Sequence, residues 1–179
     1  NQLDERVIKS LLDQGAPIDI FGVGTSLVTG NPDAALDGVY KLSMAEGEAR
    51  LKISDNIAKV SLPGQKKILR FRDQENKFYA DAVCLVHEGQ PDIMIHPLEP
   101  TKRLLLNGYE YEEIMVKTMH QGKKCYEPLS VQQIAAFSKQ RLSQLPEEHQ
   151  RFDYPHIYKV GLSSELHSLR NSLVASKQL

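Results

Sequence analysis

The chain has 179 residues, of which 41% are hydrophobic and 25% are charged, and this composition is that of a folded globular domain rather than a disordered segment. Its 22 basic and 23 acidic side chains leave a formal net charge of -1, so no overall field would draw it to nucleic acid or to an anionic membrane. No apolar run approaches the ~20 residues of a membrane-spanning helix. We therefore predict neither a nucleic-acid partner nor a membrane partner.

Two further features of the sequence bear on the cellular location and on whether the chain is part of a longer protein. The only cysteines, Cys84 and Cys125, are too few for a disulfide framework, which favours a reducing, cytoplasmic location. The chain opens at Asn1, without an initiator methionine, and runs directly into a helical pattern. We interpret it as a fragment of a longer protein.

Residues 1–42 have the order helix, strand, glycine loop. Asp4 is a suitable N-cap, and Gly15 a suitable end, for a helix with apolar residues at helical spacing. Those residues are Val7, Ile8, Leu11 and Leu12. A strand is predicted over Ile18–Phe21, broken by Gly22 and Gly24. This order predicts an α/β fold in which residues 1–42 form the final segment of an α/β barrel.

Residues 43–127 are predicted to form a β-rich domain, because after Pro32 the apolar runs become short and alternate. The predicted strands are Val39–Leu42, Leu51–Ile53, Ile68–Arg72, Phe78–Val86, Ile93–Ile95 and Ile114–Met119. Turn sequences separate them at Glu46-Gly47, Pro63-Gly64, Glu88-Gly89, Asn107-Gly108 and Gln121-Gly122.

Residues 128–179 are predicted to be a helical C-terminal extension. Ser130 and Gln133 have the spacing of a capping box, before a helix that ends at Pro146. Its apolar stripe is Ile134, Phe137, Leu142 and Leu145. A last helix follows Ser163, with Glu165 in its first turn and with Leu166, Leu169 and Leu173 on its buried face.

The glycine loop is the motif that points to chemistry. Gly22 and Gly24 directly follow the predicted strand, where the backbone can approach a ligand without a Cβ in the way. Exposed amides there, with the hydroxyls of Thr25 and Ser26, would suit a phosphate group. A Gly-x-Gly after a strand also occurs in plain tight turns, so the pattern alone leaves both interpretations open.

A resemblance along nearly the whole chain favours the phosphate interpretation. The run Gly15–Thr25 resembles the signature loop of nicotinate phosphoribosyltransferases, which belong to the type II phosphoribosyltransferase family. Further segments resemble that family in the same order: Gly38–Leu42, Lys52–Asn56 with Lys59, Leu62–Lys67 with Arg70, Asp153–His156 and Val160–Ser163.

The resemblance implies an ATP-coupled enzyme of NAD salvage. Nicotinate and phosphoribosyl pyrophosphate would give nicotinate mononucleotide and pyrophosphate, with Mg²⁺ and ATP as cofactors and a homodimer as the assembly. It implies that Gly22, Val23, Gly24 and Thr25 grip the 5′-phosphate. The family's phosphorylated histidine, its base-selecting residues and a second phosphate loop lie upstream, so this chain holds no catalytic residue and is expected to be inactive alone.

Three lysines are further candidates for phosphate contacts. Lys59 and Lys67 belong to a basic stretch that also contains Lys66 and Arg70, and Lys41 lies within an apolar run. The alternative is that these side chains are simply solvated, as most charge runs are.

Zinc is not predicted, although Cys84 with His87 and His120 with Cys125 pair suitable ligand types. The paired spacing is not repeated, and Cys84 lies in a strand pattern as a small core residue. For function, two alternatives stay open: a non-catalytic oligomerisation or regulatory module, and a nicotinamide or quinolinate phosphoribosyltransferase relative. The strings Gly-Val-Gly-Thr and Pro-Gly-Gln-Lys-Lys favour the nicotinate branch.

Overall fold

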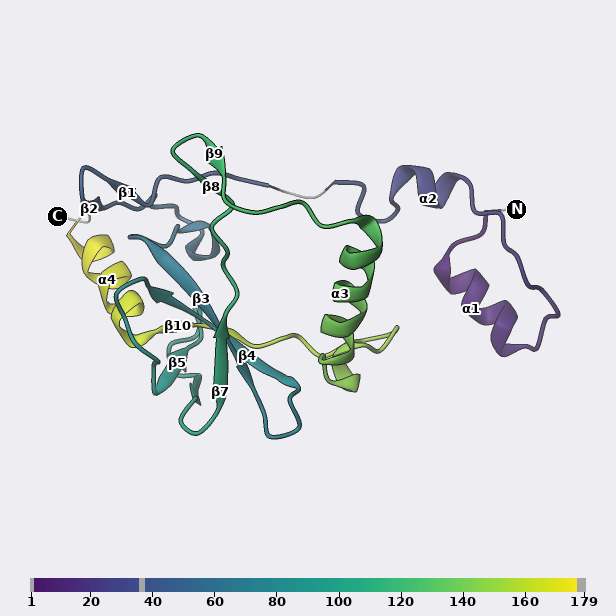
Figure 1. Ribbon diagram of the computed structural model, residues 1–179. Helices are drawn as coiled ribbons and strands as arrows, with labels where there is room; N and C mark the ends of the chain where they lie inside the picture. Colours follow the sequence, from purple (N-terminus) through teal and green to yellow (C-terminus); the bar gives the residue numbers. More distant parts are fainter. Residues whose placement is uncertain (1, 36–37, 177–179) are drawn as a thin grey trace. The chain divides into compact units, whose positions relative to one another are not determined.

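The computed structural model describes residues 2–35 and 38–176 of the chain. It divides into two compact units, Asn1–Tyr40 and Lys41–Leu179, which are described separately below (Figure 1). Asn1, residues 36–37 and residues 177–179, which fall in the predicted first and third segments, lie outside the described residues.

The first unit contains two helices, α1 (Glu5–Asp13) and α2 (Thr25–Thr29). The predicted cap of α1 is confirmed, because the Asp4 carboxylate accepts a hydrogen bond from the Val7 amide at 2.8 Å. Gly15 follows the helix with φ of 73°, a left-handed conformation that glycine adopts without strain.

The strand predicted over Ile18–Phe21 is wrong. This segment is not a strand, and the Ile20 side chain is 87% exposed. The physical reason is that a strand needs a neighbour to complete its ladder of hydrogen bonds, and the described part of this unit has no strand to pair with it.

The second unit is built on a six-stranded mixed sheet in the order β6-β5-β10-β4-β3-β7. Only β10 and β4 run parallel, and every other neighbouring pair in this sheet is antiparallel. The strands are β3 (Lys66–Arg72), β4 (Phe78–Leu85), β5 (Ile93–Ile95), β6 (Arg103–Leu105), β7 (Glu110–Glu113) and β10 (Val160–Ser163). The prediction of mixed strands and helices is confirmed.

Smaller elements surround this sheet. Two hairpins are formed by β1 (Met44–Ala45) with β2 (Glu48–Ala49) and by β8 (Met119–His120) with β9 (Lys123–Lys124). A 3-10 turn, η1, covers Ile57–Lys59, and a second, η2, covers Glu147–His149. The helices are α3 (Val131–Ser143) and α4 (Ser164–Ala175). Both hairpin turns, at Glu46-Gly47 and Gln121-Gly122, were predicted correctly, and all four residues have positive φ.

Alternation along β3 and β4 places the core on one face of the sheet. Leu69 and Phe71 project to this face from β3, while Arg70 and Arg72 project to the other. The cluster of buried residues comprises Leu69, Phe71, Ala80, Ala82, Cys84, Met94 and Leu106. Each large side chain in it contributes about 1.5–3 kcal/mol on burial.

Helix α4 covers part of the opposite face. Leu166 and Leu169 pack there against Leu85 and Leu162, as the predicted apolar stripe required. The Ser163 hydroxyl accepts a hydrogen bond from the Leu166 amide at 3.1 Å and so caps the helix. Figure 1 shows α4 beside the β10 side of the sheet, within this unit.

Helix α3 has the predicted capping box, formed by Ser130 and Gln133. Its apolar stripe is only partly covered, because Phe137 remains 58% exposed and Ile134 and Leu142 are also exposed. The segment predicted to be a helical C-terminal extension also contains β10, which lies inside the sheet.

Three strand predictions are confirmed and three are wrong. Ile68–Arg72, Phe78–Val86 and Ile93–Ile95 match β3, β4 and β5. Val39–Leu42, Leu51–Ile53 and most of Ile114–Met119 have no strand structure. In the last case the edge strand β7 lies just upstream, where acidic residues pair with the arginines of β3.

Candidate functional site

The glycine loop belongs to the first unit and leads into α2. Gly24 is the N-cap residue of this helix, and Thr25 is its first residue. A Cβ added to Gly22 or to Gly24 would have no heavy atom within 4 Å among the described residues. The amides in the first turn of a helix have no partner inside the helix. The loop therefore offers open backbone, with Thr25 exposed and Val23 half-buried.

Two of the three candidate lysines lie together in the second unit. The Lys41 ammonium donates a hydrogen bond to the Lys59 carbonyl at 3.0 Å, and both side chains are exposed. Lys59 ends the 3-10 turn η1, which the Asn56 side chain caps by accepting from the Ala58 amide at 3.0 Å. This contact joins two of the segments that carry the family resemblance.

Lys67 lies apart from this pair on β3, where its ammonium donates to the Glu88 carbonyl. Its neighbour Lys66 is half-buried and donates to the carbonyls of Leu62 at 2.9 Å and Gly64 at 2.6 Å. Burial lowers the pKa of Lys66. The Lys66 ammonium therefore holds the backbone around the Pro63-Gly64 turn, and the Lys67 ammonium holds the backbone at Glu88.

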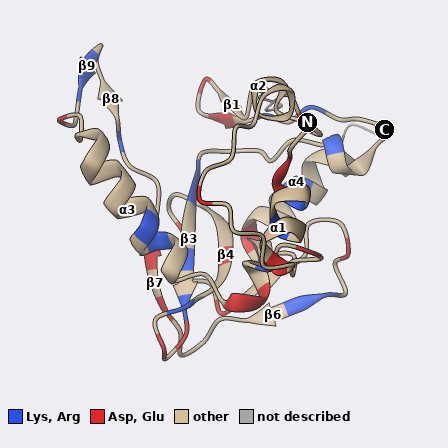
Figure 2. Cartoon of the chain, turned by 90° about the vertical axis from the view of Figure 1, so that its right-hand side faces the viewer, with Lys and Arg blue, Asp and Glu red and all other residues tan. Residues whose placement is uncertain are grey.

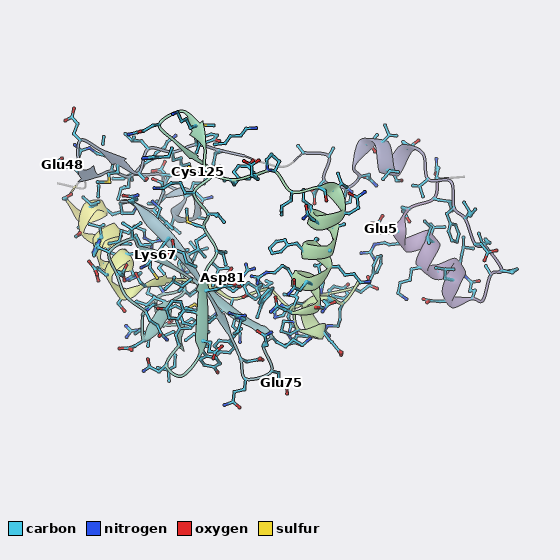
Figure 3. All side chains as sticks on the ribbon, viewed as in Figure 1. Glu5, Glu48, Lys67, Glu75, Asp81 and Cys125 are labelled. Carbon is cyan, nitrogen blue, oxygen red and sulfur yellow. The ribbon has the colours of Figure 1, made fainter. Side chains whose placement is uncertain are left out.

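Arg70 is engaged in an ion pair that the sequence interpretation missed. Its guanidinium makes two hydrogen bonds to the Asp81 carboxylate, at 2.9 Å and 2.7 Å. The Tyr158 hydroxyl donates to the same carboxylate at 3.0 Å. The hydrogen bonds that Arg70 donates to Asp81 raise the pKa of Arg70, and burial together with the Asp81 charge raises the pKa of Tyr158. Figure 3 shows Asp81 among the side chains of the sheet.

The sequence contained a signal for this cluster, because Asp81 interrupts an otherwise apolar strand. A carboxylate at a buried position needs a charged partner. Arg70 lies directly opposite it in the register of β3 and β4. Arg70, although it belongs to the basic stretch, therefore has a structural role that uses donors of its guanidinium.

Glu112 takes part in a second ion pair, and its side chain is half-buried. It lies opposite Arg70 on β7 and forms an ion pair with Arg141 of α3. The Arg141 guanidinium also lies over the Phe78 ring, 4.5 Å from its centre. This ion pair ties α3 to the edge of the sheet.

The cysteines and histidines do not assemble as metal ligands. Among the described residues, no group of three or more His, Cys, Asp or Glu side chains is placed to hold a metal ion. Cys84 is fully buried, and burial, followed by the nearby Glu88 charge, raises the pKa of its thiol to about 12. It is therefore a core residue, as predicted, whereas Cys125 is exposed (Figure 3). Within the described ranges, no helix is both long and apolar enough to cross a bilayer.

Comparisons with known proteins point to one family. A family model described as the nicotinate phosphoribosyltransferase C-terminal domain matches residues 65–170, more than half of the chain. A human protein named nicotinate phosphoribosyltransferase is 31% identical over 182 residues, covering 99% of this chain and 34% of that protein. A Bacillus subtilis (strain 168) protein of the same name is 33% identical over 174 residues, covering 92% of this chain and 36% of that protein.

A solved structure agrees with these matches. The crystal structure of human nicotinic acid phosphoribosyltransferase superposes with a TM-score of 0.71 at 26% identity, covering 97% of this chain and 32% of that one. The chain thus spans about a third of the length of these relatives. It belongs to the nicotinate phosphoribosyltransferase family.

Proposed function

We propose that this chain is the C-terminal part of an enzyme that joins nicotinate to phosphoribosyl pyrophosphate, giving nicotinate mononucleotide and pyrophosphate with ATP hydrolysis. The observation that carries the proposal is the match along 99% of the chain to a protein named for this activity. A cytoplasmic homodimer is part of the same proposal.

In this proposal the loop Gly22–Thr25 holds the 5′-phosphate of the phosphoribosyl group. Its support is local: the two glycines are open, so backbone amides can approach a phosphate without steric obstruction. Charge that develops on the departing pyrophosphate needs fixed donors, and such donors are worth several kcal/mol in related chemistry. The loop would contribute binding and orientation rather than proton transfer.

The three candidate lysines are assigned phosphate contacts of different strength. Lys41 and Lys59 form an exposed pair, and we assign both a phosphate contact in the complete enzyme. Lys67 is assigned a weaker contact, because its side chain is half-buried and its ammonium donates to the Glu88 carbonyl. We expect Mg²⁺ to bind to the substrate phosphates, as is common for this ion. No carboxylate cluster among the described residues of this chain is assigned to it.

The test is an assay of a protein of the relatives' length that contains this chain. Given nicotinate, phosphoribosyl pyrophosphate, ATP and Mg²⁺, it should release pyrophosphate, and nicotinamide or quinolinate should replace nicotinate poorly. The 179-residue chain alone should release none. Absence of turnover in the longer protein would favour the non-catalytic module instead, and preference for another base would favour a different branch.

A further inference from the structure

A cleft opens in the second unit at the end of β5, beside the beginnings of β6 and β10. It has a volume of about 450 Å³. We call it the β10 cleft and define it by six of its lining residues. They are Met94, His96, Lys102, Leu104, Lys159 and Gly161.

These residues project to one face of the sheet. Met94 lies opposite Ser163 on β10 and opposite Leu104 on β6, and residues at partner positions share a face. Alternation then places Gly161 on the same face. Backbone hydrogen bonds extend the ladders by one residue, from His96 to Lys102 and from Asp81 to Lys159, both at 2.9 Å. The basic residues just beyond the strand ends are therefore aligned with the apolar ones.

The floor of the cleft is apolar because Gly161 has no side chain. A Cβ added there would lie 2.9 Å from the Met94 Cγ, so the methionine packs directly over the glycine backbone. Leu104 lies beside Met94 in the register. Such a floor would stabilise a hydrocarbon group by roughly 25 cal/mol for each Å² removed from water.

The rim is basic, and no Asp or Glu lines the cleft. The Lys159 ammonium lies 4.6 Å from the centre of the Tyr79 ring and has no carboxylate partner among the described residues. Lys102 is paired with Glu99 at 2.7 Å, but its side chain is 64% exposed. Figure 2 shows a further basic segment in β6. The rim thus carries positive charge that the cleft itself does not neutralise.

His96 adds a ring N–H donor to this rim. Its Nδ1 accepts hydrogen bonds from the amides of Leu98 at 3.3 Å and Glu99 at 3.0 Å. A ring nitrogen that accepts two amide hydrogen bonds carries no proton, so Nε2 bears the proton and is the available donor.

We propose that the β10 cleft binds a small organic anion, namely a carboxylate or phosphate monoester carried on an apolar body. The floor accounts for the hydrocarbon part, and Lys102, Lys159 and His96 account for the anionic part. A bare anion would leave the floor unused, and a neutral hydrocarbon would leave the Lys159 ammonium without a carboxylate partner among the described residues. No residue of the glycine loop is among those that line this site, and the proposal does not depend on the proposed function.

The four methionines provide the test. In the full chain labelled with ¹³C-methyl methionine, Met94 reports on the cleft, while Met44, Met115 and Met119 do not line it. Cyclohexanecarboxylate or cyclohexyl phosphate should shift the Met94 resonance saturably, and comparison of the two decides between carboxylate and phosphate. Acetate and cyclohexanol, which each lack one part of the ligand, should not saturate at about 10 mM.

Substitutions make the test specific. Lys102→Gln with Lys159→Gln should weaken binding at least about tenfold, because two charged donors are lost. The matched control, Lys123→Gln with Lys124→Gln on the exposed hairpin strand β9, should leave binding unchanged. If the double variant does not fold, Lys102→Gln alone should weaken binding about threefold.

Three outcomes would overturn the proposal. One is a Met94 resonance whose chemical shift does not change with either anion at about 10 mM. Another is equal binding by the wild type and the charge-deleted variant. The third is a Met94 shift that depends on protein concentration alone, since a second copy of the chain would then occupy the cleft.

Discussion

Gly24→Val should lower kcat/KM for pyrophosphate release by at least about 100-fold in the complete enzyme, because misplacing a bound substrate by about 1 Å can cost that much. The substitution places an isopropyl group in the space that a bound phosphate would need. No described residue lies within 4 Å of the new Cβ, so the loss should come from the ligand site rather than from a clash inside the protein.

A second glycine provides the control. Gly89 is also open, with no heavy atom within 4 Å of an added Cβ, and its φ lies outside the left-handed region. Gly89→Val should therefore retain normal turnover. The test is the steady-state kcat/KM of both variants, with thermal unfolding as a check that each variant folds. Normal turnover by Gly24→Val would show that the phosphate does not bind at this loop.

Phe71→Ala should lower the free energy of unfolding of the second unit by about 3–5 kcal/mol, the usual cost of removing a buried phenylalanine ring. Phe71 is 0% exposed and lies in the centre of the main core cluster, with Tyr111 at a ring distance of 5.7 Å. The small residues Ala80 and Ala82 beside it cannot expand to fill the cavity.

Urea denaturation followed by far-UV circular dichroism measures this change. The matched control is Phe137→Ala on α3, where the ring is 58% exposed and the expected loss is under about 1 kcal/mol. Similar losses for the two variants would mean that α3 is covered as fully as the core, or that Phe71 is not in it.

Helices α1, α3 and α4 could be predicted from the sequence because their signals are local. Asp4, Ser130 and Ser163 accept hydrogen bonds from amides three residues ahead, so each cap and its helix lie within one short segment. The strands β3 and β4 were equally visible, because Leu69 and Phe71 alternate with arginines and β4 is an almost continuous buried run.

Two of the strands that were missed, β10 and β7, depend on distant partners. β10 has four residues, one of them Gly161, and its parallel pairing with β4 joins Val160 to Asp81 across a long stretch of chain. β7 consists of three glutamates and a tyrosine, which have low or mixed β-propensity. It forms at the sheet edge because its acidic residues face Arg70 and Arg72.

Some features of the candidate site could likewise be predicted from the sequence, and others could not. The openness of Gly22 and Gly24 was predictable from residue type and position. The use of Arg70 by Asp81, and the β10 cleft itself, were not, because both depend on the register between strands that are far apart in sequence. The predicted closing segment of a barrel stays a prediction, as does the phosphate role of the loop.

A crystal structure of the complete enzyme with nicotinate mononucleotide tests the central claim most directly. We expect the 5′-phosphate to accept hydrogen bonds from the backbone amides of Gly22–Thr25, at the N···O distances of about 2.7–3.2 Å that such bonds show. Density for that phosphate at any other part of the protein, with the loop left empty, would contradict the account.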